Sequence, residues 1–267
     1  MNRSVDWRAY WATAPDWNAH DQLALSVREH VLGPGTIDRT IDPADAARAM
    51  SCSVRRHKGS GALMHTASLI PRVDSEYPFE IVLNALDPLP RQRFSIAHEL
   101  GHTFFYDRSL EPPARLLRIG GKAEERFCDE FAGELLLPNE NIPEDAGPTL
   151  LVRLAERFLV SVQVVAWRAM RRQKWLAILG LSWKGSRRKP DDIALRVDWL
   201  ATPPGTWVPV DAKYRSGPAL ELGESGFGAG ISDLALGSLR GEFMQQAGPL
   251  PDGGVLLMIE PLETAKG

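Results

Sequence analysis

Residues 91–102 read Arg91-Gln92-Arg93-Phe94-Ser95-Ile96-Ala97-His98-Glu99-Leu100-Gly101-His102, and this stretch decides the fold we expect. The segment before it, Asp87-Pro88-Leu89-Pro90, prevents a strand from continuing and favours the start of a helix. We therefore predict a helix from Arg91 to about Tyr106. Its apolar residues lie around most of the helix, which is typical of a buried helix. Polar side chains buried on such a helix need partners, because burying them alone is costly.

The spacing of His98 and His102 predicts a metal site. Residues four apart lie on one helix face, so both imidazoles can point at one ion. Two histidines at this spacing form a recurrent half-site for Zn²⁺. Glu99 lies beside them and can take a proton from a zinc-bound water. Gly101 costs about 1 kcal/mol inside a helix, which makes sense if another backbone packs closely against it.

A second helix, predicted from about Lys122 to Leu137, offers a third ligand. A catalytic zinc site normally has three protein ligands and one water. In one arrangement Glu125 binds the metal, and Asp129 accepts a hydrogen bond from the non-coordinating nitrogen of a ligand histidine. The residues alone do not choose among four carboxylates: Glu124, Glu125, Asp129 and Glu130. Cys128 is an alternative soft ligand, but we interpret it as a small buried hydrophobe, the commoner role of a lone cysteine on such a helix.

The remaining elements predict an α+β fold in three parts. Residues 1–148 hold N-terminal helices (Asp21–Leu32, and one begun by Asp42 and Pro43) and short strands (Ala62–His65 and Phe79–Leu83) around the two helices described above. Residues 149–175 form one or two helices. Residues 176–267 form a separate mixed α/β or β domain, because short apolar segments alternate with turns rich in Gly and Pro. Lys184–Lys189 is interpreted as a basic linker.

Composition excludes several classes of protein. Of the 267 residues 44% are hydrophobic and 24% are charged, which suits a globular protein with a sizeable core. The formal net charge of −3 gives no bulk attraction to nucleic acid or to a membrane. Two cysteines, Cys52 and Cys128, cannot make a disulfide framework. Since the chain also has no signal-peptide pattern and no long apolar run, we expect a cytoplasmic protein with no membrane span.

Both predicted helices together resemble the ImmA/IrrE family of bacterial and phage metallopeptidases. Residues 91–102 match the family pattern RxRFtlAHElGH. Residues 125–138, Glu125-Arg126-Phe127-Cys128-Asp129-Glu130-Phe131-Ala132-Gly133-Glu134-Leu135-Leu136-Leu137-Pro138, resemble its second pattern, E-x-x-x-N-x-FA-x-x-LL-x-P. Asp129 stands where the family usually has Asn, and it can play the same role toward a ligand histidine. The resemblance covers about residues 78–138.

This resemblance implies a metallopeptidase core with a small sheet and an active-site helix pair. It places the third Zn²⁺ ligand at Glu125, beside His98 and His102, with Glu99 as the catalytic residue. Residues 149–175 resemble the helix-turn-helix-like segment that follows the core in many members. Family members typically cleave a helix-turn-helix repressor, which implies a protein substrate of that kind and a role in stress response or mobile-element transfer. The strand Phe79–Leu83 is expected to offer an edge for a substrate loop.

Two other functions compete with this interpretation. One is a DNA-binding regulator that uses the arginines of residues 149–175, but the acidic balance of the chain makes direct nucleic-acid binding unlikely. The other is a zinc-bearing regulator whose peptidase activity is latent or lost. A salt-dependent shift of labelled DNA tests the first alternative, and metal content and cleavage, measured separately, test the second.

Overall fold

The computed structural model describes residues 7–12, 16–58, 67–73, 75–116, 121–171, 175–186, 188–222 and 226–262. The chain divides into two compact units. Unit 1 holds residues 1–141 with Arg157–Val160, and unit 2 holds Ile142–Glu156 with residues 161–267. Among the described residues, none of the helices has the length and apolar character needed to cross a membrane.

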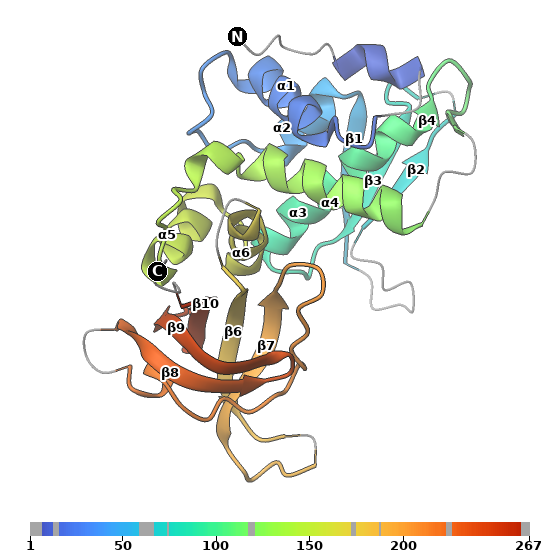
Figure 1. Cartoon of the computed structure of the whole chain (residues 1–267). Coiled ribbons are helices and arrows are strands. Elements are labelled where there is room, and N and C mark those ends of the chain that lie inside the picture. Colours follow the sequence, from blue (N-terminus) through green and yellow to red (C-terminus); the bar gives the residue numbers. More distant parts are fainter. Residues whose placement is uncertain are drawn as a thin grey trace. The chain divides into compact units, whose positions relative to one another are not determined.

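Unit 1 combines helices with a small sheet (Figure 1). Asp42 caps its second helix as predicted, since its side chain accepts a hydrogen bond from the Ala44 N–H at 2.9 Å. The helices are α1 (His20–Leu32), α2 (Pro43–Ala49), α3 (Leu89–His102) and α4 (Lys122–Leu136), with 3₁₀ turns at Trp7–Ala12, Thr103–Phe105 and Asn139–Asn141. The strands are β1 (Cys52–His57), β2 (Ala67–Pro71), β3 (Phe79–Asn84), β4 (Tyr106–Asp107) and β5 (Ala114–Arg115).

The main sheet of unit 1 has the order β1-β3-β2. β3 pairs in parallel with β1 and antiparallel with β2, so both of its edges are occupied. The prediction that Phe79–Leu83 offers a free edge is therefore wrong, and β2 is the edge strand on the side of α3. The predicted strand at Ala62–His65 lies outside the described residues. The alternation of buried and partly exposed residues explains why residues 79–84 form a strand. Phe79, Ile81 and Leu83 are buried, and the residues between them are partly exposed.

Aromatic packing fixes the end of α3 against α4. The Phe105 and Phe127 rings lie edge to face with centroids 5.2 Å apart, and Phe104 and Phe131 pack similarly at 5.4 Å. All four rings are buried. α3 ends at His102, and the 3₁₀ turn that follows carries Phe104 and Phe105 into this core, so the predicted helix is shorter than expected at its C-terminal end.

Arg28 supplies a buried cation that ties α1 to the end of α4. Its side chain is 2% exposed and donates to the carbonyl of Leu135 in the last turn of α4. It also donates to the carbonyls of Ile37 (3.2 Å) and Arg39 in the loop after α1. Burial lowers the pKa of Arg28 to about 10, with Asp38 opposing the shift, so the guanidinium remains charged at neutral pH.

Unit 2 contains an antiparallel sheet of order β7-β6-β10-β9-β8. α6 packs against β6 and β7. Position 180 of β6 holds glycine because a Cβ there would lie 2.2 Å from the Trp199 ring of β7, which would have to move. The elements are α5 (Pro148–Phe158, whose last residues belong to unit 1), α6 (Val162–Met170), β6 (Ala177–Lys184), β7 (Ala194–Ala201), a 3₁₀ turn (Pro218–Leu220), β8 (Gly228–Leu236), β9 (Leu239–Pro249) and β10 (Val255–Glu260).

The architecture is the predicted α+β fold: a helix pair with a small sheet, and a separate C-terminal sheet that is entirely antiparallel. One detail of the prediction is wrong. Lys184–Lys189 starts at the last residue of β6 and leads toward β7 within unit 2, so it connects two strands of one sheet and does not link domains.

Candidate metal centre and active site

Close contact between α3 and α4 brings the predicted site residues together. A Cβ on Gly101 would lie 2.9 Å from the Cα and 3.1 Å from the Sγ of Cys128, which is closer than side-chain carbons approach. Glycine is therefore required at this crossing, as the sequence suggested. The approach sets residues 98–102 of α3 opposite residues 124–129 of α4.

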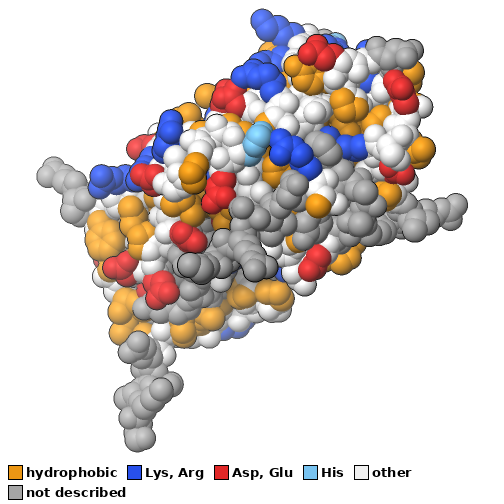
Figure 2. Space-filling view, turned by 90° about the horizontal axis from the view of Figure 1, so that it is seen from above, with side chains coloured by type: hydrophobic (Ala, Val, Ile, Leu, Met, Phe, Trp, Pro, Cys, Tyr) orange, Lys and Arg blue, Asp and Glu red, His pale blue; other side chains and the backbone are white. Residues whose placement is uncertain are grey.

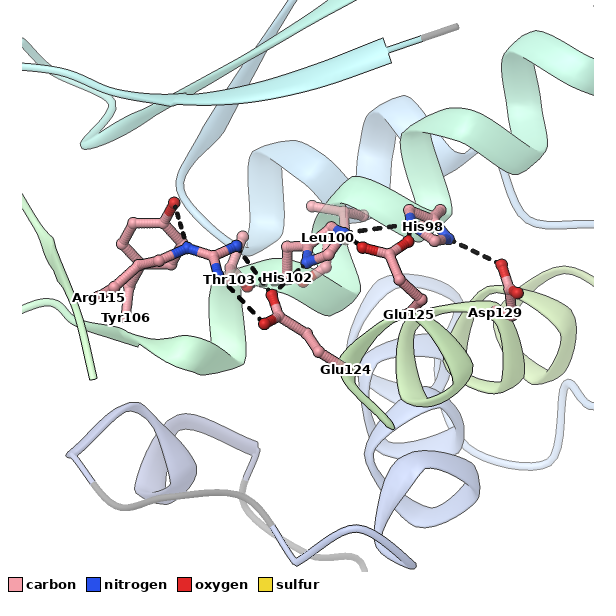
Figure 3. Close-up of polar contacts among 9 residues, drawn as sticks. All are labelled: His98, Leu100, His102, Thr103, Tyr106, Arg115, Glu124, Glu125 and Asp129. Atoms are coloured by element: carbon pink, nitrogen blue, oxygen red, sulfur yellow. Dashed lines mark hydrogen bonds and ion pairs between the residues drawn. The ribbon is translucent and has the colours of Figure 1, made fainter. Parts of the chain in front are cut away.

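The two histidines converge through their Nε2 atoms, which lie 3.1 Å apart (Figure 3). Their Nδ1 atoms face the other way, each toward a carboxylate of α4. Asp129 Oδ1 lies 2.9 Å from His98 Nδ1, and Glu124 Oε1 lies 2.6 Å from His102 Nδ1. With a metal ion bound, these contacts would keep the proton of each ring on Nδ1 and leave the Nε2 lone pairs for the ion.

The spacing of these groups fits a tetrahedral metal ion. Two imidazole nitrogens at about 2.0–2.1 Å from zinc stand about 3.3 Å from each other, close to the 3.1 Å found here. Glu125 supplies the next oxygens, with Oε2 3.4 Å from His98 Nε2 and Oε1 3.8 Å from His102 Nε2. His98, His102 and Glu125 are therefore the residues that could hold a metal ion, and Glu99 lines the same cleft as His102 and Glu125.

Cys128 also stands near the histidines. Its sulfur and the two imidazole nitrogens all lie within 4.8 Å of one another. The thiol is completely buried at the contact with Gly101, and burial with four surrounding carboxylates raises its pKa well above the usual value. Because a thiol must lose its proton to bind a metal, whereas the exposed Glu125 carboxylate already faces both Nε2 atoms, we favour Glu125 as the third ligand.

Glu99 is 9% exposed and lines a cleft of about 290 Å³. The other lining residues are Ala67, Ser68, Leu69, His102, Tyr106, Arg115 and Glu125. Burial raises the pKa of Glu99 above its ordinary value, although His102, His98 and a hydrogen bond from the Leu69 N–H act in the opposite direction. A carboxylate with a raised pKa beside a metal position is suited to accept a proton and return it.

Charge around His98 favours its protonated form when no metal is bound. Burial of the ring lowers its pKa, but the hydrogen bond and charge of Asp129, with Glu99 and Glu125, raise it overall. A metal ion binding to Nε2 must therefore displace a proton, so its affinity rises with pH through the titration of this ring.

Two residues of the site were missed from the sequence. Glu124, considered only as a possible ligand, is 1% exposed and holds His102. Arg115 of β5 pairs with Glu124 through both carboxylate oxygens, and together with His102 it more than offsets the effect of burial, so the pKa of Glu124 is lowered. Tyr106 also lines the cleft, and its hydroxyl receives a hydrogen bond from Arg115 at 3.3 Å.

Comparisons with known proteins identify the part of the chain that carries this site. The family model described as "IrrE N-terminal-like domain" matches residues 59–170. Among solved structures, the chain is similar to a Mycobacterium tuberculosis transcriptional regulator, with 13% sequence identity and a TM-score of 0.45 over 95% of this chain and 77% of that one. No curated protein matches. Residues 59–170, which contain both helices of the metal centre, thus match an IrrE N-terminal-like domain, in agreement with the resemblance to the ImmA/IrrE family found in the sequence.

Proposed function

We propose that this protein is a zinc-dependent endopeptidase. The observation that carries the proposal is the convergence of His98 Nε2, His102 Nε2 and the Glu125 carboxylate beside a cleft that contains Glu99. When bound, Zn²⁺ would lower the pKa of a water and polarise the scissile carbonyl. Glu99 accepts the proton of that water and passes it to the leaving amine. Asp129 and Glu124 hold the two imidazoles in the orientation that the site requires.

The edge strand β2 is the element best placed to bind a substrate backbone. Arg72 N–H donates to the Pro78 carbonyl at 2.9 Å, which fixes the alternation of the β2–β3 ladder. Ser68 and Ile70 thus exchange hydrogen bonds with β3, whereas Ala67, Leu69 and Pro71 turn their backbone groups outward. Ala67 and Leu69 line the cleft beside Glu99. We propose that a short extended segment pairs with β2 there.

The substrate class rests on the family. The chain contains the IrrE N-terminal-like domain, and the resemblance to the ImmA/IrrE family favours a helix-turn-helix transcriptional repressor as the protein that is cut. We propose that cleavage takes place in the cytoplasm and releases genes of a stress response or of a mobile element.

Direct nucleic-acid binding is not part of the proposal. α5 and α6 are separated by the short segment Leu159–Ser161, as in a helix-turn-helix, but Arg168 of α6 is 2% exposed and its side chain does not reach a phosphate backbone. Figure 2 shows Lys and Arg side chains interspersed with Asp and Glu over the face in view. On this face positive charge is not concentrated into the kind of patch that binds nucleic acid.

The test separates metal binding from cleavage. The wild type and Glu99→Gln are each co-expressed with the helix-turn-helix repressor encoded nearest to the gene, and zinc content and repressor fragments are measured. We expect both proteins to hold one zinc and only the wild type to cut, at a site mapped by mass spectrometry. Glu140→Gln, an exposed glutamate outside the cleft, is the matched control and should cut normally.

Two results would change the proposal. If the zinc-loaded wild type leaves the repressor intact, the peptidase function fails for this partner, and a zinc-bearing regulator with latent activity takes its place. If Glu125→Ala retains a full complement of zinc while His98→Ala loses it, the third ligand lies elsewhere, with Cys128 the next candidate.

A further inference from the structure

Arg115 and Glu124 form an ion pair between the cleft and the metal centre (Figure 3). Arg115 Nη2 lies 2.9 Å from Glu124 Oε1, and Nη1 lies 3.1 Å from Oε2, so the pair has the two-point geometry that makes arginine–carboxylate contacts specific. Arg115 also donates from Nε to the Tyr106 hydroxyl. Its side chain is half exposed, whereas that of Glu124 is 1% exposed.

Glu124 and Glu125 are neighbours in sequence, but α4 directs them to different positions. The Glu125 side chain is 59% exposed and faces the Nε2 atoms of both histidines. Glu124 lies on the other side of His102 and contacts Nδ1. Both Glu124 oxygens are bound by Arg115, and Oε1 is shared with His102. Neither oxygen is therefore available to a metal ion.

The burial of Glu124 makes its partner necessary. An ionised carboxylate taken out of water is costly unless it is paired and hydrogen-bonded. His102 alone occupies one oxygen and, as a neutral metal ligand, brings no charge. Without a cation beside it, the Glu124 carboxylate is expected to turn away from His102 toward the metal. That movement removes the hydrogen bond that orients His102.

We propose that Arg115 is a positioning residue of the metal centre: it holds Glu124 on His102 Nδ1 and thereby leaves Glu125 as the carboxylate that binds the ion. This inference rests on the proposed zinc site. It adds to that site a residue from β5, outside both motif helices, which acts through Glu124 and does not itself touch the metal.

The test measures metal affinity, not activity. Purified metal-free Arg115→Met is titrated with Co²⁺ and Zn²⁺ against a chromophoric chelator, and the visible spectrum of the Co²⁺ form is recorded. Loss of an orienting partner around a metal ligand typically weakens binding by about 10–100-fold, and we expect a loss in that range with an altered Co²⁺ spectrum. Arg126→Met removes the same charge from an exposed position on α4 and should bind within about threefold of wild type, on the same scale.

The double variant Arg115→Met/Glu124→Gln tests the route through Glu124. A neutral carboxamide still accepts the His102 N–H bond and needs no cation, so metal affinity should return to within about threefold of wild type. Circular dichroism of the metal-free proteins verifies that each variant is folded. Wild-type affinity in Arg115→Met overturns the proposal, and so does a double variant as weak as the single one.

These outcomes are distinguishable from failure of the proposed function. A protein that binds Co²⁺ and Zn²⁺ tightly but cleaves no repressor contradicts the peptidase function and leaves the affinity comparison intact. A wild type that binds neither metal contradicts both.

Discussion

The substitution Gly101→Ala sets two opposing effects of known size against each other. In an isolated helix, alanine is favoured over glycine by about 1 kcal/mol, so propensity alone predicts a more stable protein. In this structure the new Cβ would lie 2.9 Å from the Cα and 3.1 Å from the Cβ of Cys128. Ordinary contacts begin near 3.4 Å, so α3 and α4 must separate by about 0.5 Å.

Backbone atoms cannot turn aside as a long side chain can, so the cost falls on the packing of both helices. Overpacking of this kind costs about 1–3 kcal/mol, and more when backbone must move. Because the phenylalanine rings between the helices separate as well, we place the cost near the upper end of that range. The expected net change is a loss of about 1–2 kcal/mol in the free energy of unfolding, after the propensity gain is subtracted.

Urea denaturation of the metal-free protein measures this change directly. Gly230→Ala is the control, since Gly230 lies in β8 with nothing within 4 Å of the added Cβ, and it should be neutral or slightly stabilising. Zinc affinity should fall in Gly101→Ala as well, because α4 carries Glu125 and Asp129. A Gly101→Ala protein more stable than wild type by about 1 kcal/mol would refute the close-contact argument, since propensity would then act unopposed.

Three further predictions follow from single contacts. Arg28→Met should lower the free energy of unfolding by about 2–4 kcal/mol, because it removes the donor to the buried carbonyl of Leu135 and to the partly buried carbonyls of Ile37 and Arg39. The exposed Arg48→Met should change it by less than about 0.5 kcal/mol, and equal effects of the two substitutions in urea denaturation would contradict the role of Arg28. Burial raises the pKa of Cys52 to about 12, so between about pH 9 and 11 the unfolded chain loses a thiol proton that the folded chain keeps. The free energy of unfolding should therefore fall with pH more steeply in the wild type than in Cys52→Ala, by up to about 1.4 kcal/mol per pH unit. Parallel slopes for the two proteins would contradict the raised pKa of Cys52. Asp129→Ala should weaken zinc binding by about tenfold or more. Asp129→Asn keeps an acceptor for His98 Nδ1, so its zinc affinity should stay within about threefold of wild type. Equal affinities of the two variants in a chelator titration would show that the acceptor is unimportant.

Local sequence rules predicted α3 and α4 well because local forces determine them. Pro88 immediately precedes α3 and Pro90 lies in its first turn. Helical spacing of Phe127, Phe131 and Leu135 gives α4 a buried face, and Gly101 indicated a close crossing. The i and i+4 spacing of His98 and His102 needs only helix geometry. The family resemblance then chose Glu125 among four carboxylates that spacing left equivalent.

Tertiary contacts explain what the sequence did not reveal. Arg115 lies in a strand of two residues, and its ion pair with Glu124 forms only because β5 approaches α4. No local sequence pattern predicts that approach. Glu124 looks like any solvated glutamate until its 1% exposure is known. β8 and β9 were missed because small and polar residues dominate β8 (Gly228, Gly230, Ser232), and their pairing compensates for the weak strand propensity. β2 was missed because its pattern is short and ends at a proline.

The outward edge of β2 also bears on how the protein avoids associating with itself. An edge strand with free N–H groups is a template on which a second copy can add a strand. Here Pro71 has no N–H to offer, and the Leu69 N–H is engaged by Glu99. Within β2, the outward N–H groups that are free to pair are thus confined to the end at Ala67. This stretch of edge can pair with a short loop but is too short to pair with a strand of a second sheet. Glu99 therefore protects the edge beside it, and replacing it with a side chain that accepts no hydrogen bond should expose the Leu69 N–H and increase aggregation.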